Sequence, residues 1–65
     1  MTETIFEHFY NFTYKTRSGH EFSHKMKYST KERIVKEYGS LLSWLKTNVS
    51  DVSRITDHFI TSEQI

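Results

Sequence analysis

The chain has 65 residues, no cysteine and no proline, and its nine basic residues nearly balance its eight acidic ones. This length predicts a single domain, residues 1–65, with a marginal core, because so small a chain buries only about 60% of its unfolded surface. Without cysteine, neither a disulfide nor a thiolate metal site can stabilise the fold. Neither a transmembrane stretch nor a secretory signal is apparent, so we expect a cytoplasmic protein with no membrane contact.

Alternating apolar residues predict a β-hairpin, with strands over about residues 6–16 and 20–28. A three-residue loop, Arg17-Ser18-Gly19, aligns the two apolar faces and places glycine where a type I turn with a bulge needs a left-handed residue. A register shifted by one residue would put the apolar sets on opposite faces. The expected facing pairs are Tyr14–Phe22, Phe12–His24 and Tyr10–Met26 on the inner face and Lys15–Glu21 on the outer face.

A single covering helix is expected next in the chain. Ser29 and Glu32 have the spacing of a capping box, so we expect the helix to begin there and to end near Thr47, with Asn48 in a left-handed cap. Its predicted apolar stripe, at the spacing of one helical face, comprises Ile34, Val35, Tyr38, Leu41, Leu42 and Leu45.

The last segment allows two interpretations. Residues 52–59 are rich in β-branched residues and alternate in polarity, which favours a third strand, whereas Val52, Ile55, Phe59 and Ile60 also fit a short helix. We favour the strand, because a bare two-stranded hairpin under one helix is marginal. The expected fold is therefore α+β with ββαβ order, an antiparallel hairpin, one covering helix and a C-terminal strand. Residues 61–65 are expected to fray.

Catalytic and metal-binding patterns are missing from the sequence, which contains neither a nucleophile motif nor a phosphate-binding glycine loop. His20 and His24 are four residues apart on a strand, so they lie about 13 Å apart and cannot share an ion. We interpret His24 as a partly buried core histidine. The protein is expected to be no enzyme and to hold no metal or cofactor.

Basic residues gather in one part of the sequence. Residues 15–36 contain seven basic and two acidic residues, and the rest of the chain is acidic. The outer face of the hairpin should carry Lys15, Lys25 and Lys27 with Phe9. A basic sheet face with an aromatic residue is typical of binders of single-stranded nucleic acid, although lysines are also the ordinary exterior of a small sheet.

Two further features suggest a protein interface. Trp44 lies beside the apolar stripe of the helix, where it either closes the edge of the core against the last segment or forms an exposed contact residue. A three-stranded sheet also leaves an open edge, which can pair with a strand of a partner.

The layout as a whole resembles a known family. Gly19-His20-Glu21-Phe22 at the turn, Trp44-Leu45 in the helix and Val52-Ser53-Arg54-Ile55 as the last strand resemble the small RNA-polymerase inhibitor of podophages. The resemblance implies a phage protein that acts in the host cytoplasm, with arginines of the last strand contacting the polymerase. Arg54 stands in a matching place, whereas Thr56, two residues on, is not basic.

These features together predict a small protein that binds and inhibits a larger host protein by occluding its surface, with RNA polymerase or a defence or toxin protein as the target. We expect a monomer or weak homodimer that is steered onto an acidic partner surface. The alternative is a nucleic-acid-binding module using the outer face of the hairpin. The predicted contact residues are Arg17, Lys25, Lys27, Trp44 and Arg54.

Overall fold

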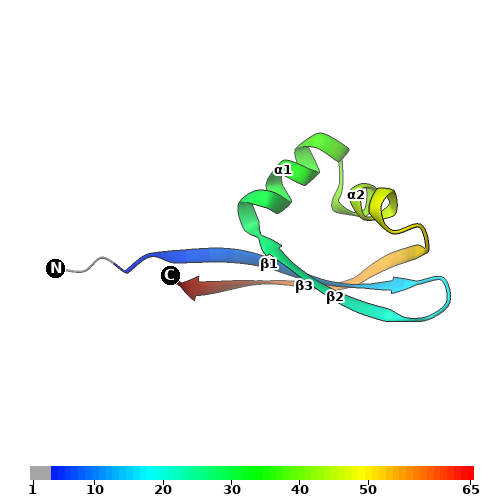
Figure 1. Ribbon diagram of the computed structural model, residues 1–65, viewed down its shortest axis with the longest axis horizontal. Coiled ribbons are helices and arrows are strands. Elements are labelled where there is room, and N and C mark those ends of the chain that lie inside the picture. Colours follow the sequence, from blue (N-terminus) through cyan, green and yellow to red (C-terminus); the bar gives the residue numbers. More distant parts are fainter. Residues whose placement is uncertain (1–3) are drawn as a thin grey trace.

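The computed structural model describes residues 4–65 and shows an α+β fold with the element order ββααβ. The strands are β1 (Phe6–Thr16), β2 (Glu21–Lys27) and β3 (Val52–Gln64), and the helices are α1 (Tyr28–Tyr38) and α2 (Leu41–Asn48). The sheet is antiparallel in the order β2-β1-β3, and both helices lie over the same face (Figure 1). Residues 1–3 of the expected lead-in lie outside the described residues.

The predicted hairpin register is confirmed. Tyr14 pairs with Phe22, Phe12 with His24, Tyr10 with Met26 and Lys15 with Glu21. The Thr16 amide donates to the His20 carbonyl at 2.9 Å, and the Gly19 amide donates to the Thr16 carbonyl at 3.0 Å. Gly19 has a φ of 91°, so the turn needs glycine for the reason that its position in the loop predicted.

The prediction of one helix from residue 29 to Thr47 is wrong, because the chain breaks between α1 and α2 at Gly39 and Ser40. Gly39 takes a φ of 84°, and its amide donates to the Val35 carbonyl at 2.9 Å, which ends α1. Ser40 then caps α2, since its Oγ accepts from the Ser43 amide at 3.1 Å. The apolar stripe continued across this break and concealed it.

Both predicted caps of the helix are also corrected. Helix α1 begins at Tyr28, and the residue before it, Lys27, makes no side-chain capping bond, so Ser29 lies inside the first turn. Asn48 is the last residue of α2, and its side-chain amide donates to the Trp44 carbonyl at 2.9 Å. The cap position belongs to Val49, which is extended with a φ of −129° rather than left-handed.

The strand interpretation of the last segment is confirmed, and the helical alternative is wrong. Strand β3 pairs with β1 over its whole length, with register shifts opposite Thr13/Tyr14 and Lys15/Thr16. It continues to Gln64, so the expectation that residues 61–65 fray is wrong. Pairing with the long central strand organises this polar segment, although its own alternation is weak.

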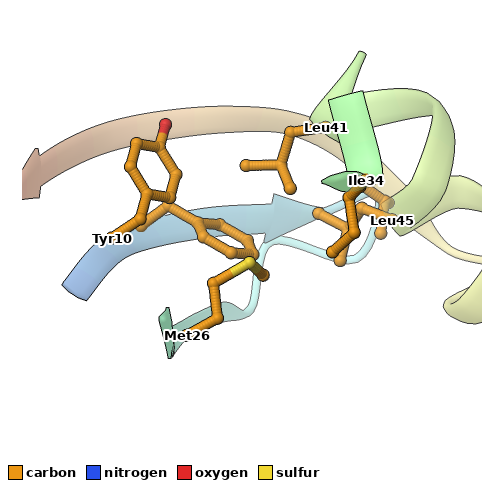
Figure 2. Close-up of a cluster of buried hydrophobic side chains, with 7 residues drawn as sticks. Tyr10, Met26, Ile34, Leu41 and Leu45 are labelled. Carbon is orange, nitrogen blue, oxygen red and sulfur yellow. The ribbon is translucent and has the colours of Figure 1, made fainter. Parts of the chain in front are cut away.

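The core lies between the helices and the middle of the sheet. Figure 2 shows Ile34, Leu41 and Leu45 from the helices facing Tyr10 and Met26 from β1 and β2. Phe12 is the most deeply buried side chain, with 1% of its surface exposed. The complete buried cluster comprises Tyr10, Phe12, Met26, Ile34, Leu41, Leu45 and Val52.

The helices cover less of the hairpin than the sequence predicted. Phe22 keeps 49% of its surface exposed, and His24, expected inside the core, is also exposed. Helix α1 contacts β1 and β2, whereas α2 contacts β3 and meets β2 through Trp44 beside His24, so Phe22 nearer the tip stays uncovered. The break at Gly39-Ser40 causes this arrangement, since a straight helix could have followed the hairpin further.

The molecule is elongated, with principal extents of 52 × 24 × 14 Å. Strands β1 and β3 run on together beyond β2 and beyond both helices (Figure 1). The pairing of β2 stops at Lys27, opposite Phe9, whereas β3 continues to pair as far as Phe6. This two-stranded extension comprises residues 5–9 and 61–65. We call it, together with the adjoining Phe59 and Ile60 of β3, the ribbon; these two residues pair with Asn11 and Tyr10, which β2 still flanks.

Candidate functional site

The five predicted contact residues do not form one patch. Lys25 and Lys27 lie on the outer face of β2, and Arg54 lies on the outer face of β3, opposite Lys15. Arg17 is exposed in the hairpin loop, and its backbone amide donates to the Asp51 carbonyl at 2.9 Å. Trp44 belongs to α2 and therefore lies on the other side of the sheet.

The two lysines of β2 are paired with carboxylates. Lys27 lies 3.3 Å from Glu7 of β1, and Lys25 forms an ion pair with Glu63 of β3 while its ammonium lies 4.4 Å from the centre of the Phe9 ring. These contacts link all three strands across the outer face. As half-exposed pairs, each contributes at most about 1 kcal/mol to stability, but both lysines have lost part of their attraction for other anions.

The outer face as a whole is electrically balanced. The sheet register brings the acidic last segment next to the basic hairpin, which the charge run along the sequence did not indicate. Four basic and four acidic side chains share the face: Lys15, Lys25, Lys27 and Arg54 with Glu7, Glu21, Asp57 and Glu63. The basic outer face expected from the hairpin alone is therefore corrected to a mixed one.

Trp44 packs against the core. It is half-buried beside the hydrophobic cluster, as the core interpretation expected, and its ring centre lies 6.1 Å from that of His24. Its aromatic neighbour therefore comes from β2 rather than from the last segment. The indole stabilises the exposed rim of the core at the place where β2 emerges from under the helices.

The histidines support aromatic and hydrogen-bonded contacts. The ring of His24 lies 5.4 Å from that of Phe12, and that of His58 stacks at 5.8 Å on Tyr10. His8 Nδ1 lies 2.7 Å from the Ser62 hydroxyl. Within residues 4–65, the structure brings together no group of three or more side chains able to hold a metal ion.

Tyr10, a residue of the core, has a raised pKa. Burial, with a smaller contribution from the neighbouring Tyr28, raises the pKa of the Tyr10 hydroxyl. The ammonium of Lys31 lies 5.0 Å from the centre of the same ring. These contacts place Tyr10 at the border between the core and the uncovered ribbon.

A shallow depression on the outer face offers about 160 Å³. This volume is below the range of about 300–1,000 Å³ that is typical of pockets for small molecules and cofactors. It accommodates a single side chain of a partner better than a cofactor. Its lining comprises Asn11, Phe12, Thr13, Ser23, His24, Lys25 and Phe59.

The most distinctive surface lies on the ribbon, and no pattern in the sequence predicted it. Seven large apolar side chains of the described chain are substantially exposed, and five of them belong to the ribbon. Polar residues interrupt the apolar alternation in residues 59–65. The sequence pattern therefore indicated only Phe59 and Ile60 as apolar positions of this segment. The five side chains are Ile5, Phe6, Phe59, Ile60 and Ile65, each exposed by 54–75%.

Comparison with known proteins assigns no family: no protein-family model, curated protein or solved structure matches the chain. Among the described residues, no helix has the length and apolar character needed to cross a membrane.

Proposed function

We propose that this protein acts by binding a larger protein through the ribbon and occluding the surface that it covers. One observation carries the proposal: of the seven exposed large apolar side chains among the described residues, three lie on the two-stranded extension and two, Phe59 and Ile60, directly adjoin it. Concentrated exposed apolar surface is typical of protein interaction sites, whereas isolated exposed apolar residues are ordinary.

The architecture of the ribbon supports the same proposal. Two strands without a covering helix are marginally stable in water, because neither face is buried. Phe6 and Ile60 project from the face that the helices cover elsewhere, while Ile5, Phe59 and Ile65 project from the outer face. A partner that contacts the ribbon would bury these side chains and order the strands at the same time.

Charge contributes to steering in this proposal. At the opposite end of the sheet, the exposed Arg17 and Arg54 lie near Lys15, with Glu21 and Asp51 close to them. An acidic partner surface would attract this end, while the ion-paired Lys25 and Lys27 contribute less. Of the five predicted contact residues, Arg17 and Arg54 therefore keep the clearest role.

The layout resemblance to the podophage inhibitor makes a bacterial RNA polymerase the first target to test, followed by defence or toxin proteins. Thr56 lies unpaired between Ile55 and Asp57 at the second register shift of β3, and its hydroxyl donates to the Thr13 carbonyl at 3.2 Å. It therefore faces the sheet backbone and adds nothing to the single arginine of this strand.

The experiment compares two tagged variants with the unaltered protein in pull-downs from bacterial lysate and with purified RNA polymerase. Phe6→Ser with Ile60→Ser removes the apolar ribbon contacts, and Phe22→Ser is the matched control, since Phe22 is exposed to a similar extent outside the ribbon. We expect a stoichiometric partner to be retained by the control and lost by the ribbon variant. Equal retention by both variants, or no stoichiometric partner at all, would overturn the proposal.

The nucleic-acid alternative has weaker support, because the outer face balances four basic against four acidic side chains. It makes a distinct prediction, since binding through phosphate contacts weakens steeply with added salt. Single-stranded DNA and RNA titrated in low salt provide the test. Tight, salt-sensitive binding that survives the ribbon substitutions would favour the alternative over the proposed protein contact.

A further inference from the structure

The free edge of β3 can be identified from its hydrogen bonds. The Ile65 amide donates to the Ile5 carbonyl at 2.9 Å, so this pair is a hydrogen-bonded one. Hydrogen-bonded and non-bonded pairs alternate along an antiparallel ladder. Along the ribbon, the odd-numbered residues of β3 therefore bond to β1, and the backbone groups of the even-numbered ones point to the open edge. These are Ile60, Ser62 and Gln64. The amide of the preceding even-numbered residue, His58, donates to Asp57 Oδ1 at 2.9 Å.

This edge carries few of the features that prevent strands from pairing with other molecules. Residues 58–64 contain no lysine, arginine or proline, and both register shifts of β3 occur nearer its start. The edge of β2 differs, since it is only seven residues long and carries Lys25 and Lys27. Lysines, short strands and bulges are the usual protection of a sheet edge.

We propose that a second copy of this chain pairs with the β3 edge, antiparallel and about a two-fold axis at Ser62. Two-fold dimers are the commonest assemblies of soluble proteins, and their interface must be complementary to itself. In this register, Phe59 lies opposite Ile65 of the second copy, and both of these side chains are more than half exposed in the single chain. Because of the two-fold symmetry, this Phe59–Ile65 pair forms twice in the dimer.

The charges and the apolar residues of β3 together select this register. With the axis at Ser62, Glu63 lies opposite Thr61 of the second copy, and no like charges face each other within residues 59–65. An axis at Ile60 would place Asp57 opposite Glu63, and an axis at Glu63 would place two carboxylates opposite each other. An axis at Thr61 would bring no like charges together, but it would place Phe59 opposite Glu63 and lose both apolar pairs. Like charges directly opposite each other destabilise a strand pair.

The dimer would cover the β3 edge, which lacks protective residues, and leave exposed the β2 edge, which has them. Pairing through β3 forms one continuous sheet in the order β2-β1-β3-β3-β1-β2, with the lysine-bearing β2 at each end. Six strands is an ordinary size for a sheet. Because the contact uses an edge, both faces of the ribbon remain free, so dimerisation goes beyond the proposed partner binding and does not depend on it.

Cysteine cross-linking tests the geometry directly, because the natural chain has no cysteine. At the axis, two Ser62→Cys residues would have Cα atoms about 5.5 Å apart, within the range for disulfides. Ser23→Cys on the β2 edge is the matched control, since both serines lie on edge strands and each makes one side-chain hydrogen bond. We expect Ser62→Cys to cross-link at least about tenfold faster, owing to its higher effective concentration.

Two further measurements test the dimer interface: the mass in solution and the effect of substitutions with opposite charges. Sedimentation of the unaltered protein at rising concentration should show the mass increasing from 7.8 kDa towards twice that value. Phe59→Lys and Ile65→Glu should each weaken dimerisation, and the double variant should restore it through pairs between the copies. A monomer at millimolar concentration, equal cross-linking at both serines or no restoration in the double variant would overturn the proposed interface.

Discussion

Phe12 is the residue on which the core depends most. It lies on the central strand, is 1% exposed, and its ring packs near those of Tyr10, Tyr14 and His24. A chain this short has few other large buried side chains to compensate for its loss. The central strand thus supplies both the hydrogen bonding and the main aromatic contact of the fold.

We expect Phe12→Ala to lower the free energy of unfolding by about 3–5 kcal/mol, the usual cost of deleting a buried aromatic side chain. That loss approaches the whole stability of many small domains, so the variant should be largely unfolded at room temperature. Urea unfolding followed by circular dichroism measures the change. Phe22→Ala is the control, because the side chain is half-exposed and its loss should cost much less.

Tyr10 should make stability sensitive to alkaline pH. Its folded pKa is raised by burial and by Tyr28, so the folded state favours the neutral hydroxyl. The corresponding stability is fully present below the unfolded pKa of about 10 and is lost as the pH rises through the higher folded value. Tyr10→Phe should therefore lose less stability above that pH than the unaltered protein. Parallel pH dependences of the two unfolding midpoints would contradict this assignment.

At the scale of the elements, the break between α1 and α2 determines which surfaces are covered. Gly39 ends the first helix and Ser40 begins the second, so each helix packs on a different part of the sheet. This division buries Val52 of β3 under the helical layer and leaves Phe22 of β2 half-exposed. Two adjacent residues thereby decide the outline of the core.

The capping assignments lead to opposite expectations for two serines. Ser40→Ala should destabilise the protein by about 1 kcal/mol, because it removes the acceptor for the Ser43 amide at the start of α2. Ser29→Ala should have little effect or stabilise slightly, since Ser29 is exposed inside α1 and alanine is the better helix former. Thermal unfolding of both variants provides the measurement, and an equal loss in both would restore the single-helix interpretation.

For the whole molecule, the dominant feature is the contrast between a covered middle and an uncovered ribbon. The helices and all three strands meet around Tyr10 and Met26, while only two strands continue beyond Phe9. Local stability in proteins follows such differences in packing. The ribbon is therefore the part whose stability depends most on a partner or on a second copy.

Hydrogen exchange should report this contrast. In dilute solution, the amides of the ribbon that bond between β1 and β3 should exchange faster than those of Tyr10, Phe12 and Tyr14 in the covered middle. Raising the protein concentration should slow exchange at Ile60 and Ser62, whose amides face the open edge of β3. Uniform protection along β1 would contradict the marginal ribbon. Exchange at Ile60 and Ser62 that stays equally fast at high protein concentration would contradict the edge pairing.

Local patterns were sufficient to predict the hairpin. Alternation of side chains along Tyr10, Phe12 and Tyr14, with glycine at the third loop position, allowed only one register, because a shift of one residue exposes a whole apolar face. The capping signal at Ser29 failed for the opposite reason: it depends on where the chain leaves β2, which the strand pairing decides. The break at Gly39-Ser40 was visible in the residues but not in the apolar stripe.

The amino-acid sequence by itself determined the α+β class and the hairpin register, since both depend on periodicity and turn chemistry between near neighbours. It favoured a third strand but left a helix open, and pairing with β1 decided between them. Only the tertiary structure decided which part of the sheet is covered, how Glu7 and Glu63 neutralise the lysines of β2, and that Ile5 and Ile65 meet at the end of the ribbon. These features join residues up to 60 positions apart, and their positions follow from the pairing of whole strands rather than from any local pattern.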